Sequence, residues 1–217
     1  SNTAYTKHQI PIKYATTIRL GRFMKIGIIS DTRVTKGDQL PPEVFRAFDG
    51  VDLILHAGGI YTSDVLDKLE DIAPIKATGR ITSGDAERPL PTSMEGGGDP
   101  RVSGETVLEL EGHKIGLINE LILSKLSDDV MPGVIENHHL PDHQLGEMLE
   151  EVFGQVVDIV VFGRTLYALI EEHQDILFIN PGSPNLPRHL QKLGTVAILN
   201  LTPDSREVRL IELANLS

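Results

Sequence analysis

The sequence contains no cysteine among its 217 residues. This absence excludes disulfide bonds, thiolate metal sites and cysteine nucleophiles. No apolar run approaches the roughly 18 residues that a membrane-spanning helix needs, and residues 1–23 lack the charged-then-apolar order of a secretory signal peptide. We therefore expect a cytoplasmic protein that does not cross a membrane.

Positive charge is scarce relative to negative charge. The chain has 20 Lys and Arg residues against 31 Asp and Glu residues, so that its formal net charge is -11 and its pI is about 5.1. A surface of this charge repels the phosphates of nucleic acids and anionic membranes. Neither a nucleic acid nor a membrane is therefore an expected partner.

The length and composition indicate one large domain. Hydrophobic residues make up 40% of the chain and charged residues 24%, which is ordinary for a globular protein. The chain is also long enough to bury a substantial core. Residues 1–23 read as an N-terminal arm that begins with an expression scar and forms either an edge strand or a disordered segment. Residues 24–217 form the domain.

Buried strands alternate with helices in the first part of that domain. Apolar runs at 24–29, 51–59 and 74–79 are typical of buried strands, and apolar residues at helical spacing predict helices over 42–48 and 62–72. This β-α-β-α-β series predicts a parallel sheet with right-handed crossovers. Ligand crevices in such sheets lie beyond the carboxyl ends of the strands.

The second part of the domain has a different pattern. Residues 81–104 are rich in Gly, Pro and Ser, and we expect a loop insert that is either a lid or disordered. Residues 105–119 predict a hairpin that turns at Glu111-Gly112, and residues 142–153 predict a helix capped by Asp142. Four later segments predict at least four more strands: 156–165, 167–183, 194–202 and 206–213.

The strand ends resemble those of the calcineurin-like metallophosphoesterases. Six blocks occur in the order and spacing of that family: GIISDT, LILHAG, ATG, KIGLIN, DIVVFG-T and FINPGSPNLPR. They are most similar to its small bacterial and archaeal phosphodiesterase branch, which also contains the small subunit of the retromer coat. The resemblance covers about residues 24–210. It implies an α/β fold, a two-sheet α/β/β/α sandwich, in which active members hold two divalent metals at the strand ends.

The resemblance also implies seven metal-ligand positions, and only one of them keeps the family's residue. The motif Asp-x-His is Asp31-Thr32-Arg33, Gly-Asp is Gly58-Gly59, Gly-Asn is Gly79-Arg80, the histidine after IGL falls at about Asn119, and Gly-His-x-His is Gly163-Arg164-Thr165-Leu166. One carboxylate cannot hold two metals, and a guanidinium offers no lone pair. We therefore expect neither a dinuclear centre nor another cofactor.

Arginines replace the expected residues at three of these positions. The resemblance implies that Arg33, Arg80 and Arg164 converge on one crevice. They could form a closed network with Asp31 and Glu120, bind a phosphate-like anion, or point to water after random drift. The residues that we expect to line this pocket are Asp31, Arg33, Gly59, Arg80, Asn119, Glu120, Arg164, Asn180, Gly182, Ser183 and Arg188.

Histidines supply the other candidate site. His138, His139 and His143 lie in one segment, and the last two have the four-residue spacing of a helical metal pair. Pro141 lies between them, so that a helix begins only after it and the pair does not share a helix face. A solvated acidic loop therefore competes with a metal site here. His56 ends a buried strand, where we expect a hydrogen-bonded core histidine rather than a ligand.

Three hypotheses for function follow from these residues. In the first, the chain lacks metal-dependent catalysis and acts as an anion-binding or protein-interaction module, for which the retromer subunit is a precedent by resemblance. In the second, it is an active phosphodiesterase or phosphatase with Mn, Zn, Fe or Ni at a site rebuilt from Asp31, Glu120, Asp128, Asp129 and the 138–143 loop. In the third, the loop 81–104 covers the crevice and the chain offers only an interaction surface.

Overall fold

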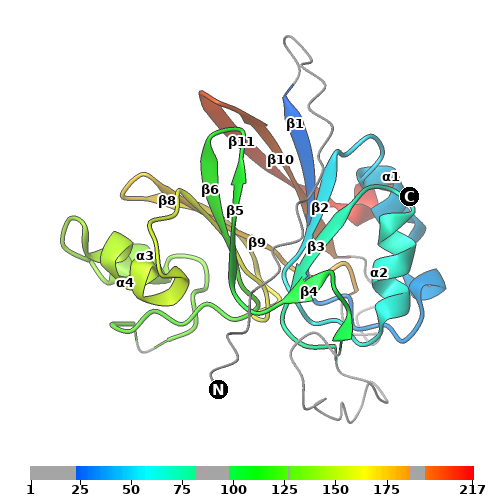
Figure 1. Ribbon diagram of the computed structural model, residues 1–217, viewed down its shortest axis with the longest axis horizontal. Helices are drawn as coiled ribbons and strands as arrows, with labels where there is room; N and C mark the ends of the chain where they lie inside the picture. The colour runs from blue at the N-terminus through cyan, green and yellow to red at the C-terminus, as the bar shows by residue number, and fades with distance from the viewer. Residues whose placement is uncertain (1–22, 82–97, 127, 186–193) are drawn as a thin grey trace, which may run out of the picture.

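Two β-sheets packed against each other form the centre of the structure (Figure 1). This computed structural model describes residues 23–81, 98–126, 128–185 and 194–217. The first sheet has six strands in the order β11-β10-β1-β2-β3-β4, and the second has five in the order β5-β6-β7-β9-β8. Helices cover the outer faces, so that the layers are α/β/β/α and the predicted sandwich is confirmed.

The strands of the first sheet are Met24–Ile29 (β1), Leu53–His56 (β2), Ile75–Thr78 (β3), Val102–Ser103 (β4), Thr195–Thr202 (β10) and Ser205–Glu212 (β11). Those of the second are Thr106–Leu110 (β5), His113–Leu117 (β6), Ile159–Val161 (β7), Ala168–His173 (β8) and Ile176–Pro181 (β9). The run β1 to β4 is parallel, as is β6-β7-β9, whereas the remaining pairs are antiparallel.

The helices are Pro42–Ala47 (α1), Ser63–Glu70 (α2), Val134–Asn137 (α3) and Gln144–Phe153 (α4), with 3-10 helices at Gly37–Gln39 (η1) and Leu213–Leu216 (η4). Helices α1 and α2 pack on the first sheet, and α3 and α4 on the second. Within the described residues, no helix is long and apolar enough to cross a membrane.

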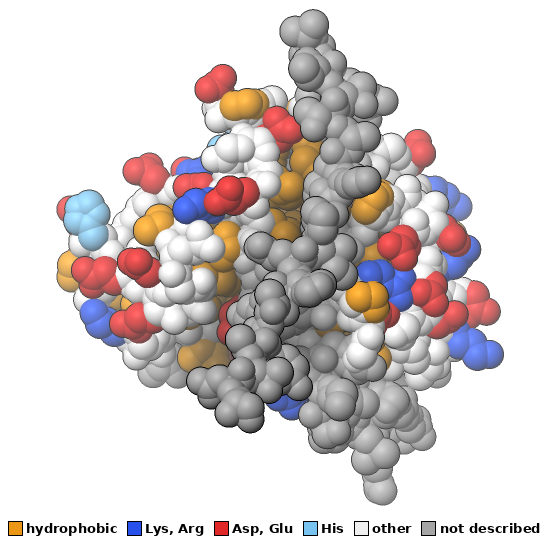
Figure 2. All heavy atoms as spheres, in the orientation of Figure 1, with side chains coloured by type: hydrophobic (Ala, Val, Ile, Leu, Met, Phe, Trp, Pro, Cys, Tyr) orange, Lys and Arg blue, Asp and Glu red, His pale blue; other side chains and the backbone are white. Residues whose placement is uncertain are grey.

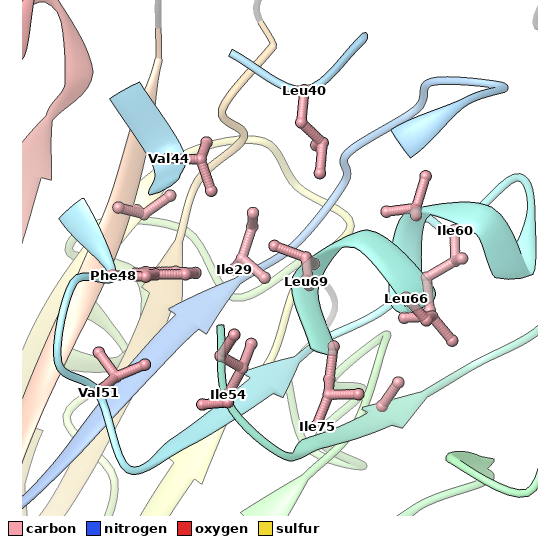
Figure 3. Packing of buried hydrophobic residues seen from close by; sticks show 14 of the residues in the cluster. Ile29, Leu40, Val44, Phe48, Val51, Ile54, Ile60, Leu66, Leu69 and Ile75 are labelled. Carbon is pink, nitrogen blue, oxygen red and sulfur yellow. The ribbon is translucent and has the colours of Figure 1, made fainter. Parts of the chain in front are cut away.

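Side chains on alternate sides of β1 supply two different cores. Ile26 and Ile28 face the second sheet and belong to the core between the sheets, whereas Ile29 belongs to the core under α1 and α2. This alternation follows from the two-residue repeat of a strand. In the helical core, Ile54 and Ile75 of neighbouring strands face Leu69 of α2 (Figure 3). Cores on both faces hold the strand ends at fixed positions.

Several local predictions differ from the structure. Strand β4 lies inside the segment 81–104 that we expected to be a loop, because Val102 pairs with Ala77 of β3. The cap of α4 is His143 in the left-handed region, so the prediction of Asp142 is wrong. The predicted arm 1–23, apart from Phe23, and residues 82–97 of the predicted insert lie outside the described residues.

Charged side chains of both signs are scattered over the surface. On the face shown in Figure 2, acidic groups lie over both halves of the described surface, with basic groups between them. This mixture agrees with the formal net charge of -11. Basic side chains are therefore not concentrated on this face of the molecule.

Candidate functional site

The ends of five strands bring their following residues to one cavity. Asp31 follows β1, Gly59 follows β2, Arg80 follows β3, Asn119 follows β6 and Arg164 follows β7. All five line a cavity of about 650 Å³. The strands are parallel within each sheet, so their carboxyl ends meet at the same edge, where ligand crevices form in such folds.

Seven of the eleven residues predicted for this pocket line the cavity: Asp31, Arg33, Gly59, Arg80, Asn119, Glu120 and Arg164. Ile60 and Tyr61 line it too, and sequence analysis missed them. Their position directly after Gly59 could have predicted this, because the residues that follow a strand end line the crevice there. The structure does not place Asn180, Gly182 or Ser183 in the lining, and Arg188 lies outside the described residues.

Asp31 is the buried acid of the cavity, with 2% of its surface exposed. Its Oδ1 accepts a hydrogen bond from Nη2 of Arg33 at 3.3 Å, and its Oδ2 accepts one from the backbone N–H of Arg164 at 2.8 Å. Burial raises the pKa of Asp31, and the Arg33 charge and the Arg164 N–H oppose that rise without cancelling it. One guanidinium and one backbone amide therefore stabilise this carboxylate.

The three arginines differ in what they contact. Nη2 of Arg33 reaches Asp31, and Nε of Arg164 lies 2.7 Å from Oε1 of Glu120. The Arg164 and Glu120 side chains are 58% and 39% exposed, so their pair contributes at most about 1 kcal/mol. Arg80 is exposed on the cavity wall, and no acidic side chain of the described residues pairs with it. Arg33 and Arg164 thus have acidic partners, whereas Arg80 has none among the described residues.

The backbone at this edge adopts an unusual conformation. Asp31, Arg33, Arg164 and Leu166 have φ values of 51°, 48°, 68° and 65°. L-residues other than glycine rarely enter the left-handed region, at a cost of about 1 to 2 kcal/mol each. The family resemblance assigns all four positions to metal ligands. Of the four side chains, only that of Asp31 offers oxygen lone pairs to a metal, since guanidinium and leucine groups do not.

A dinuclear metal centre does not fit the side chains that are present. The ideal Cβ position on Gly59 lies 2.6 Å from both Cα and Oδ1 of Asp31, so no bridging carboxylate has room there. Oδ1 of Asn119 is buried without a hydrogen-bond partner, but it lies against the backbone of Gly58. Across the described parts of the chain, no group of three or more His, Cys, Asp or Glu residues could hold a metal.

His56 is fully buried and serves the backbone beside the cavity. Its Nδ1 accepts the N–H of Gly58 at 3.2 Å, which leaves the proton on Nε2 to be donated to Oγ1 of Thr32 at 3.3 Å. Burial lowers the pKa of His56 to about 3. This neutral histidine therefore links the loop after β1 to the loop after β2 and is not a ligand.

Asn180, Gly182 and Ser183 support the wall of the cavity from behind, and the expectation that they line it is corrected. Nδ2 of Asn180 donates to the carbonyl of Gly163 at 3.2 Å. Oγ of Ser183 donates to the carbonyl of Asp31 at 2.9 Å, and the carbonyl of Gly182 accepts from Ser30. Asn180 and Ser183 are buried, and these hydrogen bonds hold the loops that form the cavity.

The histidine segment lies apart from the cavity. His138, His139 and His143 are exposed, and none of them lines the cavity. Nδ1 of His138 lies 2.8 Å from the carbonyl oxygen of Val134, which occupies that nitrogen. Asp128 and Asp129, the other members of the rebuilt metal site, are also exposed and outside the lining. The structure does not bring this predicted set together.

Comparisons with known proteins identify the family of this chain. Residues 24–204 match the family described as the calcineurin-like phosphoesterase superfamily domain. A protein named "Probable metallophosphoesterase" from Methanocaldococcus jannaschii is 32% identical over 182 residues, which cover 83% of this chain and 79% of that protein. A second protein with that name, from Methanothermobacter thermautotrophicus, is 31% identical over 76% of this chain and 80% of its own.

A solved structure gives the same fold. The structure described as a novel archaeal phosphodiesterase is similar with a TM-score of 0.54 at 21% identity, over 87% of this chain and 100% of that chain. At this level of identity the likeness concerns the fold alone. The matched family domain and the two archaeal relatives show that this chain belongs to the calcineurin-like phosphoesterase superfamily.

Proposed function

We propose that this chain binds a phosphate-like anion in the cavity at the strand ends, through arginines and without a metal. The observation that carries the proposal is Arg80, a guanidinium on the cavity wall without an acidic partner among the described residues. A guanidinium presents several N–H donors in a planar fork that matches the oxygens of phosphate. Arg80 is therefore available as the primary anion contact.

The charges around the cavity support this proposal. Three arginines line it, against two carboxylates, Asp31 and Glu120. Asp31 pairs with Arg33, and Glu120 pairs with Arg164, so that the charge of Arg80 is not compensated by a described acidic residue. The cavity thus carries local positive charge in a protein whose formal net charge is -11. Such a local excess attracts an anion to this edge of the sheets.

The relatives favour phosphate over other anions. Proteins of this superfamily are named for phosphoester chemistry, and one solved structure of the same fold is described as a phosphodiesterase. We infer that this chain keeps the ligand class of the family. It replaces the attraction of two metal ions by that of guanidinium groups, which act at the same strand ends.

Titration calorimetry with inorganic phosphate at low ionic strength tests the proposal. We expect saturable binding by the unaltered chain, with affinity about tenfold lower in Arg80→Ala, because one charge-assisted contact is lost. Arg209→Ala is the matched control, since Arg209 is also an exposed arginine but does not line the cavity. Equal phosphate affinity in Arg80→Ala and Arg209→Ala would contradict the role of Arg80 as the primary anion contact, on which the proposal depends.

The competing hypothesis of a rebuilt metal site has its own test. It requires turnover of a generic aryl phosphodiester in the presence of Mn²⁺, with loss of that turnover in Asp31→Ala. Our proposal predicts that the unaltered chain and the Asp31→Ala variant hydrolyse the ester equally slowly. Manganese-dependent turnover that disappears with the Asp31 carboxylate would refute the metal-free reading.

A further inference from the structure

A second, smaller cavity of about 210 Å³ adjoins the arginine-lined cavity. The two cavities share Gly79, Arg80, Asn119 and Glu120 in their walls. Gly79 has a φ of 98°, and a Cβ there would lie 3.2 Å from Cβ of Asn119. Gly79 therefore contributes only backbone to the wall that the two cavities share.

The smaller cavity differs from the larger one in its chemistry. Its wall includes Glu105, which directly precedes β5, and Ile118, which directly follows β6. Thr78 at the end of β3 lines it as well. The Glu105 carboxylate is exposed and forms no hydrogen bond or ion pair with another described residue. The hydroxyl of Thr78 already donates to the carbonyl of Gly104 at 2.8 Å. Among the residues not shared with the larger cavity, the group left for a ligand is therefore the Glu105 carboxylate, a hydrogen-bond acceptor, beside the apolar Ile118.

The volume is too large for phosphate alone. The larger cavity measures about 650 Å³, whereas inorganic phosphate has the size of a few water molecules, at about 30 Å³ each. Cavities of about 300 to 1,000 Å³ usually hold organic ligands or cofactors. A phosphate on the arginines would leave most of the space to a group attached to it.

We propose that the ligand is a sugar phosphate, an inference that rests on the proposed anion binding. Its phosphate lies on Arg33 and Arg80, and its hydroxyls reach past Gly79 and donate to the Glu105 carboxylate. A carboxylate is an acceptor only, so it favours a ligand part rich in hydroxyl donors. Arg80 lines both cavities, and it therefore contacts the anion at the junction of the two ligand parts.

Calorimetry with ribose 5-phosphate, ethyl phosphate and inorganic phosphate tests this inference. We expect ribose 5-phosphate to bind about tenfold more tightly than ethyl phosphate, since hydroxyl donors on a charged acceptor give gains of this size. Glu105→Ala should abolish that advantage while the affinity for inorganic phosphate is kept or raised. Glu109→Ala, an exposed residue of β5 outside both cavities, should retain the advantage.

These outcomes distinguish a failure of the sugar-phosphate inference from a failure of the anion-binding proposal. Equal affinity for ribose 5-phosphate and ethyl phosphate, or an advantage that survives Glu105→Ala, overturns the sugar-phosphate inference while anion binding stands. Tighter binding of phosphoethanolamine than of ribose 5-phosphate also overturns it, because the acceptor would then select an amine. Failure of all these anions to bind the unaltered chain contradicts both proposals.

Discussion

A Cβ on Gly59 would stand 2.6 Å from Oδ1 of Asp31. The buried carboxylate thus lies against the backbone of the next strand end, in space that any larger side chain would need. Asp31 is held there by Arg33 and by the backbone N–H of Arg164. The arrangement is a closely packed charge network and leaves no room for a second carboxylate.

Gly59→Ala should therefore destabilise the chain by about 3 kcal/mol or more, because overpacking adds to the cost of a left-handed alanine. Gly50→Ala is the matched control: its φ of 68° is close to the 73° of Gly59, but no atom lies within 4 Å of its Cβ position. We expect the control to lose only about 1 to 2 kcal/mol. Urea denaturation measures both changes, and equal losses would show that Asp31 does not fill this space.

Removing the charge of Glu120 should strengthen anion binding. Glu120 pairs with Arg164 at 2.7 Å and adds negative charge to the cavity wall. Glu120→Gln leaves the guanidinium without a charged partner, so phosphate affinity should rise about threefold to fivefold, as suits an exposed pair. Glu207→Gln, an exposed residue of β11 outside the cavity, is the control. Weaker phosphate binding by Glu120→Gln in calorimetry would mean that Glu120 itself supports the site.

Asp99 should contribute stability that depends on pH. Nε and Nη2 of Arg101 donate to its two carboxylate oxygens at 2.9 and 2.7 Å, and these bonds lower the pKa of Asp99 to about 2. A lowered pKa means that the contribution is complete above the ordinary value of 3.8 and is lost as pH falls through about 2.

Asp99→Asn should accordingly cost about 2 kcal/mol at neutral pH, and the difference from the unaltered chain should shrink as pH falls below about 4. Asp71→Asn removes an acid that is 67% exposed and pairs with Lys68, and it should cost less than about 1 kcal/mol. Urea denaturation across pH measures both variants. A loss for Asp99→Asn that stays constant down to pH 2 would contradict the assigned cause.

His56 should remain neutral through the physiological range. Burial lowers its pKa to about 3. As pH decreases, the histidine is therefore protonated in the unfolded chain at a higher pH than in the folded chain. The free energy of unfolding accordingly falls as pH decreases below the ordinary pKa of 6.5. Nitrogen chemical shifts in NMR should show an unprotonated Nδ1 and a protonated Nε2, unchanged from pH 8 to about pH 5. A titration of this ring near its ordinary value would contradict the Gly58 and Thr32 hydrogen bonds.

The strand ends were predictable from sequence because their signals are local. Apolar runs that stop at Asp31, at Gly59 and at Gly79 mark the ends of buried strands, and parallel strands bring those ends together. The resemblance then identified Arg80 and Arg164 at the same edge. The structure brings all five residues to one cavity.

Other features depend on contacts that are distant in sequence. Asn180 and Ser183 were expected in the pocket, but both are used by backbone groups of other loops, which sequence spacing does not reveal. Strand β4 is short and depends on its pairing with β3. The cap of α4 is His143 in the left-handed region, whereas propensity favours Asp at such a cap.

The central claim, that arginines bind the anion in place of metal ions, is tested most directly by phosphate affinity measured with and without metal. Calorimetry on the purified chain should give the same dissociation constant in excess EDTA and in saturating Mn²⁺. Loss of phosphate binding in EDTA, with recovery on addition of stoichiometric Mn²⁺, would contradict this claim.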